Sequence, residues 1–247
     1  ALRTGREILL HLNHPNFGLA VTAEDLAHVV SERFFEVYNG HPIIRHLGDE
    51  YHPSVERLWD IANTIRIANL KSPPLFGVGT DDSHKYHGKT GSRPGRGWIM
   101  VHSRYLTPEH LIRAIKRGDF YASSGVTLSS VSFDKKTGLL QLDIEAKRGV
   151  TYTTKFIGTP VKYDQKSEPR VDKKGKPIRT SRKYSDDVGK VFATVEGARP
   201  QFRLSGQELY VRAVVTSSEA HANPSFAKQH QQAWTQPVGW ENHLRGE

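Results

Sequence analysis

A short polar stretch, Gly79–His84 (GTDDSH), carries the most informative chemistry of this sequence. It follows an apolar run, Leu75–Val78, that predicts a short buried strand. Side chains alternate between the two faces of an extended chain, so we expect Asp82 and His84 to point the same way. A carboxylate and an imidazole that leave one strand end together are two ligands for a divalent metal such as zinc.

A second histidine follows another apolar run, residues 8–10, within the stretch HLNHPN. Pro15 biases His14 toward extended geometry at the end of its strand. We therefore expect His14 to join the Asp-x-His pair as a third metal ligand. His11 falls on the opposite face of an ideal strand and is predicted to be a hydrogen-bonded supporting residue.

Further polar side chains follow the next apolar run, Phe34–Tyr38. Glu36 lies inside that run, where an acid is costly unless it is paired or binds a cation. A catalytic role for Glu36 and a buried salt bridge are both consistent with this position. Asn39 and His41 follow on a loop, where substrate contacts tend to occur. Simple turn chemistry for Asn-Gly is the alternative.

The loop after His84 carries several cations close to the predicted metal ligands. His87 and Arg96 are the candidates there for contacts with an anionic substrate group such as a phosphate. A glycine-rich mobile loop is the other interpretation of the same residues.

Strand and helix patterns alternate over residues 1–127, which favours parallel βα units and an α/β fold. Helix starts are predicted at Thr22, Ser54 and Thr107, and a helix end at Gly118, from capping residues. The four strand-like runs are Ile8–Leu12, Phe34–Tyr38, Leu75–Val78 and Trp98–His102.

The pattern changes from residue 128 onward. Short alternating or β-branched runs over residues 128–216 predict a small antiparallel β-rich domain, interrupted by a long basic loop at 164–190. Residues 217–247 carry several prolines and are predicted to form an irregular tail that packs over the body.

The composition limits the classes of protein. The 247 residues suffice for one large domain with an appendage. No apolar run approaches the roughly 18 residues of a membrane span, so we expect a soluble chain. Because the sequence begins with Ala1 rather than Met, we expect a processed or truncated product, which an upstream signal could have directed to export. The absence of cysteine excludes thiolate metal ligands and leaves His, Asp and Glu.

The formal charge of +9 suggests a polyanion such as nucleic acid as an alternative partner. Much of the excess lies in residues 164–190, which include Lys173, Lys174 and Lys176. A charge run of this kind is also typical of a solvated loop. Tyr184 is its one aromatic residue, so a surface for stacking bases is not indicated.

Four stretches together resemble the C-terminal half of PHP-superfamily metallohydrolases, most closely the carbaryl-hydrolase-like (CehA/McbA) branch. They are HLNHPN at 11–16, FFEVYNGHP at 34–42, GTDDSH at 79–84 and the run from 96 to 126. The resemblance implies part of a distorted (β/α)7 barrel with two or three metal ions at the C-terminal strand ends. His14 matches the family's His-Pro ligand, and Asp82 and His84 match its late Asp-x-His pair. Glu36 matches a polar position at a strand end.

The family's opening His-x-His and Ser-Asp-His elements are absent from this sequence. The resemblance implies that they, and the N-terminal half of the barrel, would lie upstream.

The leading hypothesis is a metal-dependent hydrolase of phosphoesters or of related esters or carbamates. Zinc, manganese or iron would activate a water molecule. Asp82 would accept its proton. The alternatives are a catalytically inactive PHP-like domain that binds a polyanion through its basic segment, and a scaffold whose β-rich part mediates assembly.

Overall fold

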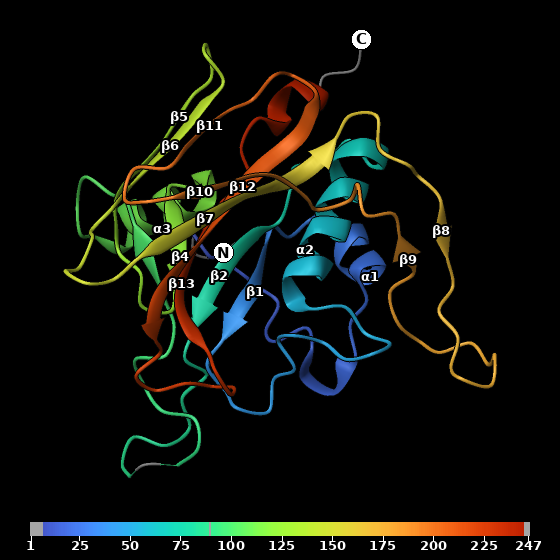
Figure 1. Ribbon diagram of the computed structural model, residues 1–247, viewed down its shortest axis with the longest axis horizontal. Coiled ribbons are helices and arrows are strands. Elements are labelled where there is room, and N and C mark those ends of the chain that lie inside the picture. The colour runs from blue at the N-terminus through green and yellow to red at the C-terminus, as the bar shows by residue number, and fades with distance from the viewer. Residues whose placement is uncertain (1–6, 89, 245–247) are drawn as a thin grey trace.

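The part of the fold that the strand–helix pattern predicts best is a two-stranded parallel sheet. The computed structural model describes residues 7–88 and 90–244. In it, β1 (Phe34–Asn39) pairs in parallel with β2 (Phe76–Thr80) (Figure 1). Every residue of β1 is buried, as expected for a parallel strand that is covered on both faces.

The predicted strand Ile8–Leu12 is wrong in extent. Leu12 alone forms a bridge, in parallel with Phe35. Its N–H donates to the carbonyl of Phe34, and its own carbonyl accepts from Glu36. Ile8 and Leu10 are about half exposed, so this run does not gain the burial that would hold a full strand against β1.

The helices begin where the capping residues predict. The side chain of Thr22 accepts from Asp25 in a capping box, and the hydroxyls of Ser54 and Thr107 cap the other two helices. Gly118 ends the third helix in the left-handed conformation, at φ 86°. The helical elements are η1 (Phe17–Leu19), α1 (Ala23–His28), α2 (Val55–Thr64), its π-helical continuation η2 (Ile65–Asn69), α3 (Pro108–Arg117) and η3 (Trp240–His243).

The largest sheet is antiparallel and has six strands in the order β10-β7-β12-β13-β4-β3. The strands are β3 (Trp98–Val101), β4 (Phe120–Ser123), β7 (Tyr152–Pro160), β10 (Lys190–Glu196), β12 (Glu208–Ala220) and β13 (His230–Thr235). The antiparallel strands predicted after residue 128 are confirmed in β7, β10 and β12.

The strand predicted at Trp98–His102 forms over Trp98–Val101, but its predicted place in a parallel βα unit is wrong. β3 does not join the parallel sheet but pairs antiparallel with β4, the strand that follows α3. Its residues alternate between exposed and half-buried, which is typical of an edge strand with one open face. Four apolar residues in a row cannot distinguish that position from a buried parallel strand.

The predicted irregular tail is also wrong in part, because residues 230–235 form β13 between β12 and β4. The sheet therefore combines strands from all three predicted segments, 1–127, 128–216 and 217–247. Across residues 7–88 and 90–244 the strands do not close into a (β/α) barrel.

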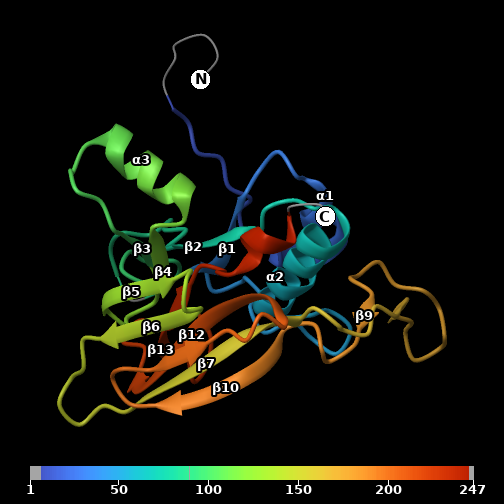
Figure 2. The ribbon, with the colours of Figure 1, turned by 90° about the horizontal axis from the view of Figure 1, so that it is seen from above.

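Two smaller sheets complete the fold. β5 (Leu128–Asp134), β6 (Leu139–Ile144) and β11 (Gln201–Arg203) form one of them. The basic segment 164–190 holds the other, the short pair β8 (Ser167–Glu168) and β9 (Lys183–Tyr184), and projects from the body beside α1 (Figures 1 and 2). No helix in the described part of the chain has the length and apolar content needed to cross a bilayer.

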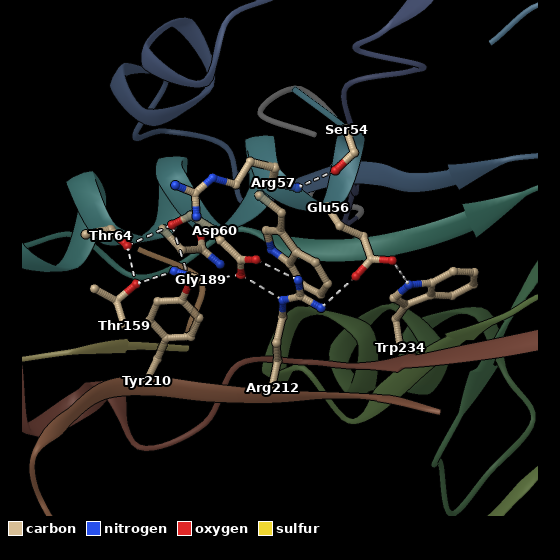
Figure 3. A network of polar contacts seen from close by, with 12 residues as sticks. Ser54, Glu56, Arg57, Asp60, Thr64, Thr159, Gly189, Tyr210, Arg212 and Trp234 are labelled. Carbon is tan, nitrogen blue, oxygen red and sulfur yellow. Dashed lines mark hydrogen bonds and ion pairs between the residues drawn. The ribbon is translucent and has the colours of Figure 1, made fainter. Parts of the chain in front are cut away.

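A buried ionic network joins α2 to the large sheet (Figure 3). The Arg212 guanidinium donates from Nε and Nη2 to the two oxygens of Asp60, at 2.8 and 2.7 Å. Its Nη1 donates to Glu56 at 3.2 Å, and the guanidinium lies 4.7 Å from the ring centre of Trp59. The Tyr210 hydroxyl adds a bond to Asp60 at 3.0 Å. This network fixes the helix that packs against β1.

Candidate functional site

The candidate site lies where β1 and β2 end side by side. Asn39 and Thr80, the last residues of the two strands, are partners in the parallel register. The N–H of Gly40 then donates to the carbonyl of Thr80 at 2.8 Å. Because parallel strands end at one edge of a sheet, the polar residues that follow each strand meet there.

Glu36 is buried at this edge, with its side chain directed to both strands and to the N-terminal segment. Its Oε2 accepts from the backbone N–H of His14 at 2.6 Å and from Asn39 at 2.8 Å. Its Oε1 accepts from the Thr80 hydroxyl at 2.8 Å. Within the described residues this carboxylate has no ion-pair partner, so hydrogen bonds rather than a salt bridge hold it in place.

Asn39 connects the two carboxylates of the cluster. Its Nδ2 donates to Glu36 and, at 3.1 Å, to Oδ2 of Asp82. Its Oδ1 accepts from the N–H of His41 at 2.8 Å. The amide was predicted to contact substrate, whereas here it orients protein groups.

The predicted Asp-x-His pair is brought together. Oδ1 of Asp82 lies 2.9 Å from Nε2 of His84. Burial acts to raise the pKa of Asp82, but the hydrogen bonds from Asn39 and His84, with the electrostatic effect of the nearby histidines, outweigh it, so this pKa is lowered. The carboxylate is therefore ionised at neutral pH. The ring of His41 lies edge-on to that of His84, with centroids 5.5 Å apart.

The backbone is strained at two of the three predicted metal ligands. His14 has φ 29° and Asp82 has φ 45°, in the left-handed region that residues other than glycine rarely adopt. The prediction that His14 is extended is therefore wrong. Its N–H is held by Glu36, and its carbonyl accepts from Phe17 in a tight turn, which outweighs the bias from Pro15.

Sequence reasoning missed Asp81, which folds the following loop back over the site. Its carboxylate accepts three consecutive backbone N–H groups, those of residues 95, 96 and 97, at 2.9, 2.6 and 2.8 Å. A hint was present in the glycines at 95 and 97, which let the loop backbone approach the carboxylate closely.

Arg96 and His87, the predicted substrate contacts of the loop, lie in different environments. Arg96 is buried, and its guanidinium donates to the carbonyl of Gly40 at 2.8 Å and to Asn223 at 3.1 Å. Arg96 therefore links the loop that follows β1 to the segment 221–229, and these contacts use its donors. His87 is exposed on the loop, and no hydrogen bond links it to the cluster in the part of the chain that is described.

The donor types at the site suit a divalent metal, but their number falls short. Among residues 7–88 and 90–244, no three His, Asp or Glu side chains are placed to hold one metal ion together. Asp82 and His84 would supply two ligands, whereas a catalytic zinc site uses three from the protein. The predicted three-ligand set is thus not assembled, and the His14 ring lies beside that of Phe17, with centroids 5.2 Å apart.

Comparison of the chain with protein-family models, with curated proteins and with solved structures found no match.

Proposed function

We propose that this chain contributes the Asp82–His84 pair to the centre of a metal-dependent hydrolase that acts on phosphoesters or on related esters or carbamates. The observation that carries the proposal is an ionised carboxylate hydrogen-bonded to an imidazole at the common end of two parallel strands. Ligand sites in α/β folds occur at such strand ends. The resemblance of the sequence to PHP-superfamily enzymes supports the same chemistry.

Each residue of the cluster has a part in the proposal. Asp82 and His84 are metal ligands, and Asp82 is also the acceptor for the proton of a water molecule. A bound zinc, manganese or iron ion supplies Lewis acidity that lowers the pKa of such a water. Glu36 and Asn39 are positioning residues, because they hold the Asp82 carboxylate and the His14 backbone. A catalytic centre of this kind needs at least one ligand besides these two.

The experiment is a titration with Co²⁺ and Zn²⁺ of the protein and of the double variant Asp82→Asn, His84→Asn. The chain offers a matched control in Asp49 and His52, a second aspartate–histidine pair at 2.7 Å on the surface. We expect the site variant to lose metal binding and the variant Asp49→Asn, His52→Asn to retain it. In the presence of Zn²⁺ or Mn²⁺, the unaltered protein and the control variant should hydrolyse p-nitrophenyl phosphate, and the site variant should not.

Metal affinity that is equal in the site variant and the unaltered protein would contradict the metal role. Metal binding at the pair without hydrolysis of any phosphate, ester or carbamate probe would contradict the hydrolase role alone.

The alternative of polyanion binding through residues 164–190 gains less from the structure. Lys173 lies 3.3 Å from the carboxylate of Glu50, and Arg179 lies 3.6 Å from that of Asp25. Acids of the body thus partly neutralise the projecting segment, which favours the interpretation as a solvated excursion.

A further inference from the structure

A large groove lies at the opposite end of the parallel strands from the Asp82–His84 pair. Its volume is about 1010 Å³, which suits a small organic molecule. The C-terminal end of α3, strand β5 and residues 236–241 line it, and these elements surround the ends of β3 and β4 (Figure 2). The apolar side chains of its wall include Phe76, Met100, Val131, Phe133 and Trp240.

A cation lies on the aromatic part of this wall. The guanidinium carbon of Arg33 is 4.4 Å from the ring centre of Phe76 and 5.7 Å from that of Trp240. Its Nε is buried and has no hydrogen-bond partner among the described residues. Burial lowers the pKa of Arg33, against a smaller opposing effect of Glu241, yet an arginine remains charged at any physiological pH. The groove therefore contains a charge with unused donors.

The other cations of the groove are neutralised by carboxylates. The pairs are Lys116 with Glu7 at 3.2 Å, Arg117 with Asp119 at 2.7 Å and Lys135 with Glu241 at 2.7 Å. Arg33 forms no such pair within residues 7–88 and 90–244. A second buried cation lies near it, since the charge of Arg33 helps burial to lower the pKa of Arg66 to about 10. The guanidinium of Arg66 donates hydrogen bonds to backbone carbonyls, among them those of Val29 and Pro73.

We propose that this groove binds a small molecule in which an anionic group is attached to a flat apolar body. The anion, a carboxylate, phosphate or sulfonate, pairs with Arg33, whose guanidinium presents a planar fork of donors to such groups. The apolar body lies against Met100, Phe133 and Trp240. The site is separate from the candidate hydrolase centre, because the length of β1 places them about 20 Å apart. It does not depend on the proposed function.

The test uses two fluorescent probes that differ in charge. One is 8-anilino-1-naphthalenesulfonate, and the other is the neutral N-phenyl-1-naphthylamine, which has the same rings without the sulfonate. Each is titrated into the unaltered protein, into Arg33→Gln, and into the control Arg199→Gln, which removes an exposed arginine paired with Asp143 outside the groove.

We expect Arg33→Gln to weaken binding of the anionic probe about 10- to 100-fold, the loss typical of a charge-assisted hydrogen bond. Binding of the neutral probe should stay within about twofold, and the control should change neither probe. Trp240→Ala should weaken both probes, because both share the apolar body. In the unaltered protein, added NaCl should weaken the anionic probe and leave the neutral one unchanged.

The proposal is overturned if Arg33→Gln leaves the affinity of the anionic probe unchanged, or if it weakens both probes equally. If Arg33→Gln does not fold, Arg33→Lys serves in its place. Lysine keeps the charge without the planar fork, so we expect a loss for the anionic probe that is smaller but still selective. Equal affinity of the Lys variant and the unaltered protein, with no effect of NaCl, would also overturn it.

Discussion

Replacing Asp60 by asparagine should destabilise the protein more than any single surface change. The substitution keeps the size of the side chain but removes the charge that faces the Arg212 guanidinium, which is 1% exposed against 5% for Asp60. Burial acts to lower the pKa of Arg212, but the charge of Asp60 and its hydrogen bonds raise it. Removing one partner of such a buried pair costs about 3–5 kcal/mol.

Urea unfolding at pH 7, followed by tryptophan fluorescence and circular dichroism, measures this loss. The matched control is Glu219→Gln, which removes the carboxylate of the exposed pair with Lys147 at 2.8 Å and should cost no more than about 1 kcal/mol. Arg212→Met should be as costly as Asp60→Asn, and the double variant should cost less than their sum, because no unpaired charge is then buried. A loss below about 1 kcal/mol for Asp60→Asn, equal to the control, would refute the reasoning.

Two more predictions concern stability. Burial lowers the pKa of His46 to about 4, so below its ordinary pKa of 6.5 the unfolded chain binds the extra proton. This residue should therefore lower the free energy of unfolding by about 2 kcal/mol between pH 7 and pH 5. Urea unfolding at several pH values should show that His46→Gln lacks this part of the pH dependence. The same pH dependence in the variant and the unaltered protein would contradict the prediction. Gly118→Ala should cost about 2–3 kcal/mol, because φ is 86° and the added Cβ would lie 2.9 Å from the ring of Phe76. The control is Gly149→Ala, where φ is 77° and no atom lies within 4 Å of the added Cβ, and it should cost about 1 kcal/mol in thermal unfolding. A larger loss for Gly149→Ala than for Gly118→Ala would argue against the contact with Phe76.

Local signals in the sequence predicted the elements that local chemistry determines. The caps at Thr22, Ser54 and Thr107 act within one turn, so the helices begin where those residues predict. β1 and β2 were recognisable because both are short apolar runs between polar segments. By contrast, β13 was not recognisable, because His230, Gln231 and Gln232 open it and one of its two partner strands, β4, is far away in the sequence.

The same distinction applies to the candidate site. Asp82 and His84 were expected to point the same way because an extended strand alternates its side chains, and they do lie together. The expected reason is wrong, since β2 ends at Thr80 and Asp82 has φ 45°. The environment of Arg96 could not be predicted, because its guanidinium bonds to Asn223, 127 residues away in the sequence. Glu36 was identified as an acid in an apolar run, but the sequence offered no sign that a backbone N–H, an amide and a hydroxyl, rather than a cation, would satisfy it.

The cost of this cluster to the fold argues that it serves more than stability. His14 and Asp82 both adopt left-handed backbone conformations, each of which costs about 1–3 kcal/mol in a residue other than glycine. Together they use a large share of the roughly 5–15 kcal/mol by which a folded domain is stable. Glycine at either position would relieve the strain, and an apolar residue in place of Glu36 would avoid burying an acid without a counter-charge. Both strained residues are held in place by hydrogen bonds, because the His14 N–H donates to Glu36 and the Asn39 amide donates to Asp82. For Asp82, such an arrangement is expected where the direction of a side chain matters more than its contribution to folding.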